Sequence, residues 1–341
     1  MNKKAVYMLL GAFLAVITLP AACQEEGEAV ISLLIDVDIP PSSDLAQIRS
    51  AEIKLHDLFG AITRRGGTAT IMLTEDVSSS RIRLLLAQYS VLSSFEFGVS
   101  GSQSSEQLSS MSFADQKASI ARSLAAAEAA RVCGMSEVHV MGFLPPGFDQ
   151  NTDTYRAIDD LGLMYNAGFQ AGVIYEPDHE EDVWPYQVEG HNFYALPLST
   201  ADVDGELLPL YDKKMAEEGI SASEWADILK EKYDEASAAK EPMVILISTS
   251  VSGSDEYYDG LRQFLDYAVS NNGTFANARD LVNFVKTGIL APPEVELSEC
   301  IDCEEDEIME VSIRLTETPA PEPADAVDEE TPETEETEIE A

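Results

Sequence analysis

The sequence predicts an α/β fold in which parallel strands alternate with helices. Short apolar, β-branched runs recur along the middle of the chain, and longer segments with helical periodicity lie between them. The first run, Val30–Ile39, is apolar except near its end, which is typical of a strand buried on both faces. With 341 residues, 45% of them apolar, the chain can bury a substantial core. Strands connected in this way form βα units on a parallel sheet, either open or closed into a barrel.

Each element is expected from its own residue pattern. After the first strand, Ser43 and Asp44 can cap a helix that continues to Arg65 and ends at Gly66-Gly67. The other expected strands are Thr68–Thr74, Phe95–Val99, Glu137–Phe143, Gln170–Tyr175, Phe193–Leu198 and Met243–Ser250. The other expected helices are Ser79–Tyr89, Ser112–Val132, Thr152–Leu161, Asp255–Ser270 and Ala278–Thr287. Residues 201–240 are charged and are expected to form a helical insertion. In a barrel, the residues that do chemistry follow the strands.

The first 22 residues have the organisation of an export signal. Lys3-Lys4 precede the apolar run Ala5–Leu19, which is short for a membrane span, and the small residues Pro20-Ala21-Ala22 lead to Cys23. The segment resembles a lipoprotein signal, although Pro20 stands where such signals prefer an aliphatic residue. The resemblance implies a signal peptide over 1–22, a linker over 23–29 that starts at a lipidated Cys23, and anchoring at the outer face of the cell membrane. Simple cleavage and an uncleaved anchor are the alternatives.

Acidic residues dominate the charge of the chain. Asp and Glu total 62 against 21 Lys and Arg, which gives a formal net charge of −41. A polyanion would be repelled, so nucleic-acid binding is excluded as the leading hypothesis. The last part of the chain, residues 291–341, is rich in Pro, Thr and Glu and is expected to be a disordered acidic tail. A specific acidic docking peptide is the alternative for this tail.

Several segments occur in the order found in one known family. They are Ile31–Asp38, Thr68–Thr74, Glu96–Ser104, Phe143–Thr152, Met243–Ser248 and Phe264–Phe284. Over about Val30–Lys286 the chain resembles the polysaccharide deacetylase domain (NodB homology, carbohydrate esterase family four). The resemblance implies a distorted (β/α) barrel of about seven parallel strands, which we expect over residues 30–290.

The same resemblance implies a chemistry that this chain lacks the residues to perform. The family uses a carboxylate base, a metal held by a carboxylate and two imidazoles, an Arg that orients the base, and a further His as acid. Here the paired His positions are Ser100 and Ser104, the Arg position is Leu144, and the last His position is Ser248. Because Ser hydroxyls are poor ligands for a zinc-like cation, no metal site and no cofactor are expected.

Two aspartates remain as candidates for the catalytic carboxylate. They are Asp36 and Asp38, separated by Val37 where the family has adjacent aspartates. The residues expected to line a substrate groove are Ser100, Ser104, Leu144, Pro145, Gly147 and Ser248. A compensating ligand set on a loop is the alternative to a missing metal site, and it would be drawn from His179, Glu180, Glu181, Asp182 and His191. A solvated polar loop is the favoured interpretation of that segment.

These observations favour one functional hypothesis and leave two alternatives. The favoured hypothesis is an exported, lipid-anchored, deacetylase-like protein whose active centre has degenerated and which binds cell-envelope polysaccharide. The first alternative is an active hydrolase that removes N-acetyl or O-acetyl groups from a polysaccharide and uses a divalent, zinc-like metal held by non-standard ligands. The second alternative is a structural surface protein in which the acidic tail makes the interactions.

Overall fold

The computed structural model describes residues 29–38, 45–78, 86, 89, 94–129 and 140–290. The strands are β1 Val30–Asp36, β2 Ala69–Leu73, β3 Phe95–Ser100, β4 Gly142–Leu144, β5 Tyr165–Gln170, β6 Tyr186–Gln187, β7 Tyr194–Leu198, β8 Thr200–Val203, β9 Glu206–Pro209, β10 Pro242–Ser248 and β11 Thr274–Phe275. The helices are α1 Leu45–Thr63, α2 Glu75–Ser78, α4 Phe113–Ala129, α5 Thr152–Leu161, α6 Asp212–Glu217, α7 Ala222–Ala239, α8 Asp255–Ser270 and α9 Ala278–Thr287.

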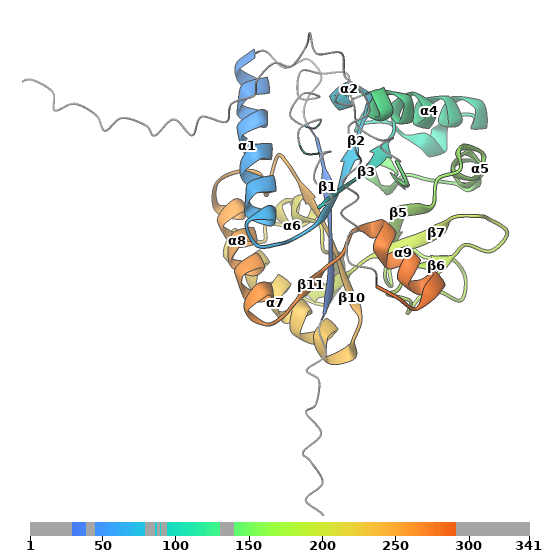
Figure 1. Cartoon of the computed structure of the whole chain (residues 1–341). Coiled ribbons are helices and arrows are strands. Elements are labelled where there is room, and N and C mark those ends of the chain that lie inside the picture. Colours follow the sequence, from blue (N-terminus) through green and yellow to red (C-terminus); the bar gives the residue numbers. More distant parts are fainter. Residues whose placement is uncertain are drawn as a thin grey trace, which may run out of the picture. The chain divides into compact units, whose positions relative to one another are not determined.

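A curled, mostly parallel sheet organises the chain, and the strands follow the order β10-β1-β2-β3-β4-β5-β7-β6 (Figure 1). Every pairing from β10 to β7 is parallel, and β6 is added antiparallel to β7. The expectation of about seven parallel strands is confirmed. The curl brings the end of β7 back to β10, where the Ser199 N–H donates to the Val244 carbonyl at 2.9 Å. The two sides of the sheet therefore nearly meet.

Continuous apolar runs form the central strands because both of their faces are covered. All seven residues of β10 are buried, and the five central residues of β1 are buried as well. Side chains alternate between the two faces, so Leu33 and Ile35 join the core under the helices. Leu34 joins a second core inside the curled sheet, together with Met72 and Leu246. Two residues of this inner core, Leu144 and Leu246, also line the cavity of the candidate site.

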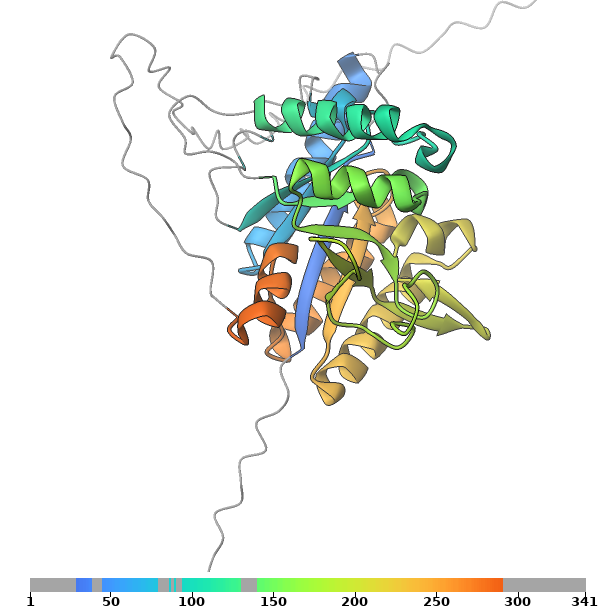
Figure 2. The same ribbon diagram turned by 90° about the vertical axis from the view of Figure 1, so that its right-hand side faces the viewer.

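Helices cover the outer face of the sheet in two groups. α7 and α8 lie side by side near α1, and Arg65, just after α1, forms a two-point ion pair with Asp266 of α8 at 2.7 and 2.8 Å (Figure 1). On the other side α4 and α5 lie next to each other (Figure 2). α5 begins with a capping box between Asn151 and Thr154 and ends at Gly162 with a positive φ of 70°.

The segment 201–240 differs from its expectation as a helical insertion. It starts with a hairpin, β8-β9, and only then forms α6 and α7. The turn of the hairpin is Asp204-Gly205, with φ of 54° and 86°, and the Asp202 side chain accepts the Gly205 N–H at 2.8 Å. Asp-Gly between apolar runs is a strong hairpin signal, and here it outweighs the helical character of the residues that follow.

Several expectations lie outside the described residues. They concern the signal peptide 1–22, Cys23 and its linker, most of the helix expected at Ser79–Tyr89, and the tail 291–341. The strand expected at Glu137–Phe143 is described from residue 140 onward, and β4 starts at Gly142. Among the residues that are described, no helix has the length and apolar character needed to cross a membrane.

Candidate functional site

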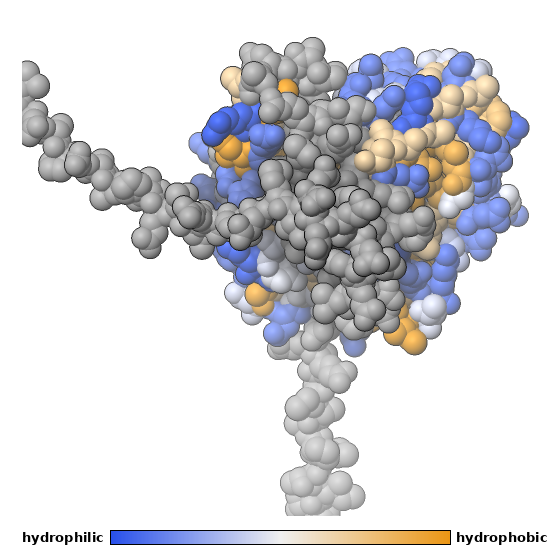
Figure 3. All heavy atoms as spheres, turned by 45° about the horizontal axis from the view of Figure 1, so that its top comes forward, coloured by the Kyte–Doolittle hydropathy of each residue, from blue (hydrophilic) through white to orange (hydrophobic). Residues whose placement is uncertain are grey.

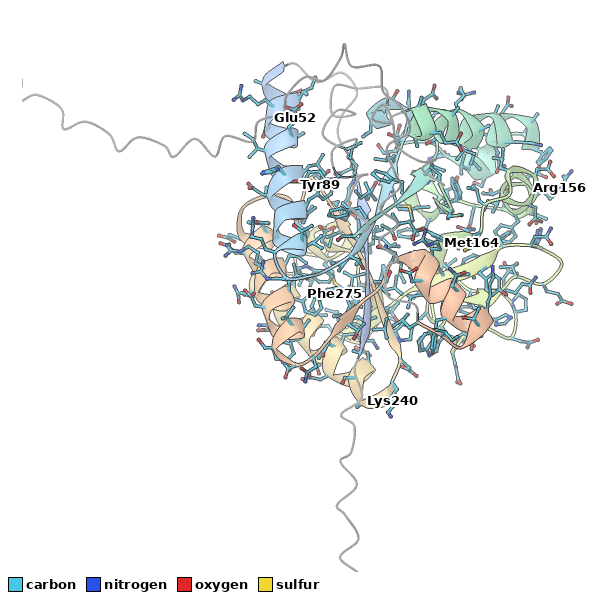
Figure 4. All side chains as sticks on the ribbon, viewed as in Figure 1. Glu52, Tyr89, Arg156, Met164, Lys240 and Phe275 are labelled. Atoms are coloured by element: carbon cyan, nitrogen blue, oxygen red, sulfur yellow. The ribbon has the colours of Figure 1, made fainter. Side chains whose placement is uncertain are left out.

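The carboxyl ends of the strands bring distant residues to one edge of the sheet. Lys240, two residues before β10, lies at the lower end of the molecule in Figure 4, so β10 and the parallel β1 run upward from there. Asp36 at the end of β1 is in register with Ser248 at the end of β10. Ser100 at the end of β3 is in register with Leu144 at the end of β4. Four of the positions singled out from the sequence therefore share this edge.

A cavity of about 580 Å³ opens at this edge. Its described lining includes six of the predicted site residues, namely Asp36, Ser100, Ser104, Leu144, Pro145 and Gly147. The lining also includes aliphatic side chains from β8-β9 and from the loop after β5, such as Leu207 and Val173. Figure 3 brings the top of the molecule forward and shows, on its right-hand side, apolar areas bordered by hydrophilic residues.

Ser248 and Asp38 are outside the described lining of this cavity, which corrects the expectation that Ser248 lines a groove. Ser248 is completely buried, and its hydroxyl accepts the Val251 N–H at 3.2 Å. The chain turns sharply after β10, so the hydroxyl closes this turn and does not face the cavity. Asp38 lies two residues beyond β1, where it contacts the same turn.

Asp36 is one of three acidic residues in the described lining of the cavity, together with Glu206 and Glu217. The Tyr211 hydroxyl donates to its Oδ2 at 3.3 Å, and the Tyr211 ring meets Phe148 edge to face at 6.0 Å between centroids. Burial, and then the negative charge of Asp38, raise the pKa of Asp36 to about 7. The Lys213 ammonium and the Tyr211 hydroxyl act in the opposite direction. Asp36 therefore changes charge near neutral pH.

Asp38 is held by the turn that follows β10. The Thr249 hydroxyl and the Ser250 N–H donate to its Oδ1 at 2.8 and 2.9 Å, and the Ser250 hydroxyl donates to its Oδ2. The Lys213 Nζ lies 3.7 Å from the same Oδ2. The Asp38 side chain is only 6% exposed, so these donors and this ammonium replace most of its water.

Asp212 is a further buried carboxyl group, and the sequence analysis did not find it. The N–H groups of Ser248 and Ser252 donate to it at 2.9 Å, which fixes the start of α6 against the turn after β10. Burial raises the pKa of Asp212 to about 7, although these donors oppose the change. The residue stands at a helix start in a charged segment, so its sequence pattern indicates a helix cap and gives no sign of burial.

The donor set at the cavity does not fit a zinc-like metal. Within the described ranges, no three or more His, Cys, Asp or Glu side chains are grouped so that they could hold a metal ion. The oxygens of Asp38 and Asp212 already accept from several donors, and the Ser100 hydroxyl donates to the Leu144 carbonyl at 2.8 Å. The cavity lining also includes the carboxylates of Asp36, Glu206 and Glu217, but these three do not form a group that could hold a metal ion, and no imidazole accompanies them in the described lining.

The imidazoles considered as replacement ligands have other partners. His179 Nδ1 lies 2.6 Å from Asp182, and its ring stacks on Tyr186 at 3.9 Å. His191 Nδ1 lies 2.6 Å from Asp159 of α5. Each imidazole thus forms its own His–Asp pair, and neither residue is in the described lining of the cavity. The favoured interpretation, a polar loop, fits these contacts better than a ligand set does.

Solved structures with the same arrangement of strands and helices identify the fold. A Mycobacterium smegmatis protein named as a polysaccharide deacetylase aligns with 79% of this chain and 94% of its own, at 14% identity and a TM-score of 0.60. A Pseudomonas aeruginosa PAO1 protein, also named as a polysaccharide deacetylase, aligns with 77% of this chain and 92% of its own, at 12% identity and a TM-score of 0.60. The fold is that of the polysaccharide deacetylases.

The same deacetylase fold occurs with another named activity. An allantoinase, Puue, aligns with 77% of this chain and 92% of its own, at 12% identity and a TM-score of 0.61. No protein-family model matches the sequence, and no curated protein matches it. At these identities the likeness establishes the fold alone, so the activity has to be argued from the residues of the cavity.

The sequence analysis missed most residues of the cavity lining, among them the polar side chains of Tyr211, Lys213 and Gln170. Tyr211 and Lys213 come from the segment that was expected to be a helical insertion, and an isolated β-bridge from Tyr211 to Leu246 brings them to the sheet. The sequence offers a weak signal, because Tyr211-Asp212-Lys213 places a phenol, an acid and an amine side by side. Their approach to Asp36 depends on tertiary contacts that no local pattern specifies.

Proposed function

We propose that this chain is an exported, surface-anchored protein with a polysaccharide deacetylase fold, which binds cell-envelope carbohydrate and does not hydrolyse it. The observation that carries the proposal is the chemistry of the cavity. At the positions where the resemblance places metal-binding imidazoles and an Arg, the cavity presents Ser100, Ser104 and Leu144. Export and anchoring rest on the sequence of residues 1–23.

The size and lining of the cavity support binding of a small portion of a polymer. A volume of about 580 Å³ lies within the range of small-molecule sites, which combine mostly apolar walls with a few polar groups. Asp36, Gln170 and Lys213 supply polar groups, while Leu144, the prolines and Leu207 supply apolar walls. Sugars carrying acyl groups present both kinds of surface.

The test is calorimetric titration of the protein with acetylated oligosaccharides from cell envelopes, together with an assay for released acetate. Ser104 is exposed and lines the cavity, so Ser104→Trp should fill part of it and weaken binding at least tenfold. Ser105 is equally exposed but is not among the lining residues, so Ser105→Trp is the matched control and should bind as the unaltered protein does. Equal affinity of the two Trp variants would refute binding at this cavity.

The active-hydrolase alternative is favoured by one observation, the raised pKa of Asp36. A carboxylate with a pKa of about 7 can accept a proton from water at neutral pH, and Asp36 lies at the floor of the cavity. On this alternative, acetate release should occur and should be lost in Asp36→Asn while binding of the glycan persists. Absence of acetate release from glycans that bind would leave the binding function in place and reject the hydrolase.

A further inference from the structure

The ammonium of Lys213 faces a carboxyl cluster that consists of Asp36 and Asp38. Its Nζ lies 3.7 Å from Asp38 Oδ2, while the side chain of Lys213 is 44% exposed and that of Asp38 is 6% exposed. The residue also lines the cavity beside Asp36. Among the described residues, Lys213 is the basic side chain that forms an ion pair with this carboxyl cluster.

The backbone around Lys213 is fixed to the sheet on both sides. The preceding Asp212 accepts N–H groups from the turn after β10, and Tyr211 forms a β-bridge with Leu246. The ammonium therefore extends from an anchored segment and reaches the cavity without requiring a large rearrangement. When Lys213 pairs, its side chain loses rotamer freedom, but no further backbone ordering is needed.

Two nearly adjacent carboxyl groups under a cavity need a positive charge close by, because burial penalises uncompensated negative charge. The fold family implies that a divalent metal supplies this charge, but the donors present here do not fit one. Lys213 stands beside these carboxyl groups with one positive charge and several N–H donors. One ammonium is enough to balance one carboxylate, and hydrogen bonds from Thr249 and Ser250 stabilise the same group.

We propose that Lys213 is the built-in cation of this cavity. Its ammonium balances the charge of Asp38 in the place of a bound metal ion, and its remaining N–H groups are available to an oxygen atom of the ligand. The cavity is consequently a metal-independent binding site, whose central positive charge belongs to the polypeptide. This inference concerns the charge of the site and does not depend on the ligand being a glycan.

A double-mutant cycle in the full-length protein tests the pairing. Lys213→Met should lower the melting temperature by roughly 2–4 °C, and this loss should largely disappear when Asp38→Asn is present. Lys214→Met is the matched control, because Lys214 also lines the cavity but forms its ion pair with Glu218 and not with Asp38. The control should change the melting temperature by less than about 1 °C, as is usual for an exposed pair.

The second measurement is zinc binding, followed by titration with ZnCl₂. The zinc binding of the variants is compared with that of the unaltered protein, because all of them share the same acidic surface. The unaltered protein and Lys214→Met should give the same weak response. Equal melting temperatures for the Lys213 and Lys214 variants, with no coupling to Asp38, would overturn the proposal. A stoichiometric zinc site in the unaltered protein that Asp38→Asn removes would overturn it as well.

Discussion

Glu96 is a buried acid at the other end of the sheet from the cavity. It lies near the start of β3, is 5% exposed, and accepts the Tyr165 hydroxyl at 2.6 Å and the Arg279 N–H at 3.0 Å. Through these bonds it connects β3, β5 and the first turn of α9. Burial raises the pKa of Glu96 to about 7, against the opposing effects of Tyr165 and Arg279.

The raised pKa of Glu96 allows a prediction of how the free energy of unfolding depends on pH. A folded-state pKa of about 7, above the unfolded value of 4.5, means that the folded state holds a proton that the unfolded state releases. Stability should therefore be highest in mild acid and should fall as the pH rises from about 4.5 through 7. In Glu96→Gln this fall should become smaller, as measured by urea denaturation at pH 5.5 and pH 8. Glu231→Gln, on the exposed side of α7, is the control and should keep the pH profile of the unaltered protein.

Strand β4 passes so close to β5 that its first residue has to be a glycine. A Cβ on Gly142 would overlap the ring of Tyr165, which is completely buried and held by Glu96. On the neighbouring β3, a Cβ on Gly98 would meet mainly the sulfur end of Met72. The two glycines face different neighbours, one rigid and one flexible, although their positions are in register.

Alanine substitutions should therefore differ in cost. Gly142→Ala should lower the free energy of unfolding by about 3 kcal/mol, because the Tyr165 ring cannot move without breaking its bond to Glu96. Gly98→Ala should cost about 1 kcal/mol, because the Met72 side chain can adopt another rotamer. Urea denaturation of both variants gives the comparison, and equal losses would contradict the assignment of Tyr165 as the rigid neighbour.

The sequence predicted the elements that have strong local signals. β1 and β10 are continuous apolar runs, and α5 begins and ends with clear caps, so these elements occur where they were expected. β6 has two residues and pairs only because its loop returns to β7, which no local pattern could indicate. The β8-β9 hairpin had a usable signal in Asp204-Gly205, which the charged residues around it obscured.

The sequence could locate those residues of the cavity that stand at the ends of strands. Asp36, Ser100 and Leu144 line one cavity because each ends a parallel strand. Ser248 also ends a strand, but the direction of its side chain depends on the turn that follows. Tyr211 and Lys213 reach the cavity from a connection between strands, and such a segment is positioned by tertiary contacts alone.

For the molecule as a whole, repulsion among the many negatively charged side chains is the electrostatic property that is easiest to test. A formal charge of −41 destabilises any compact state, because the folded chain brings the carboxylates closer together. Raising the ionic strength from 0.01 to 1 M shortens the screening length from about 30 Å to about 3 Å.

The melting temperature at pH 7.5 should therefore rise by several degrees over this range of NaCl concentration. Near pH 4.1, close to the isoelectric point, the same addition of salt should have little effect because the net charge is near zero. Differential scanning calorimetry gives both values. If the melting temperature rose by a similar amount at the two pH values, the stabilisation would come from general salt effects and not from charge screening.

The pairing of β1 with β10 has a consequence for how the chain is made. Val30 pairs with Pro242, so the first described strand has its neighbour on one side only after most of the polypeptide exists. During synthesis, β1 would present an open edge until residues 242–248 emerge from the ribosome. The sheet therefore reaches its final form late, and a chain that stops before residue 242 would leave one edge of β1 unpaired with β10 and prone to aggregation.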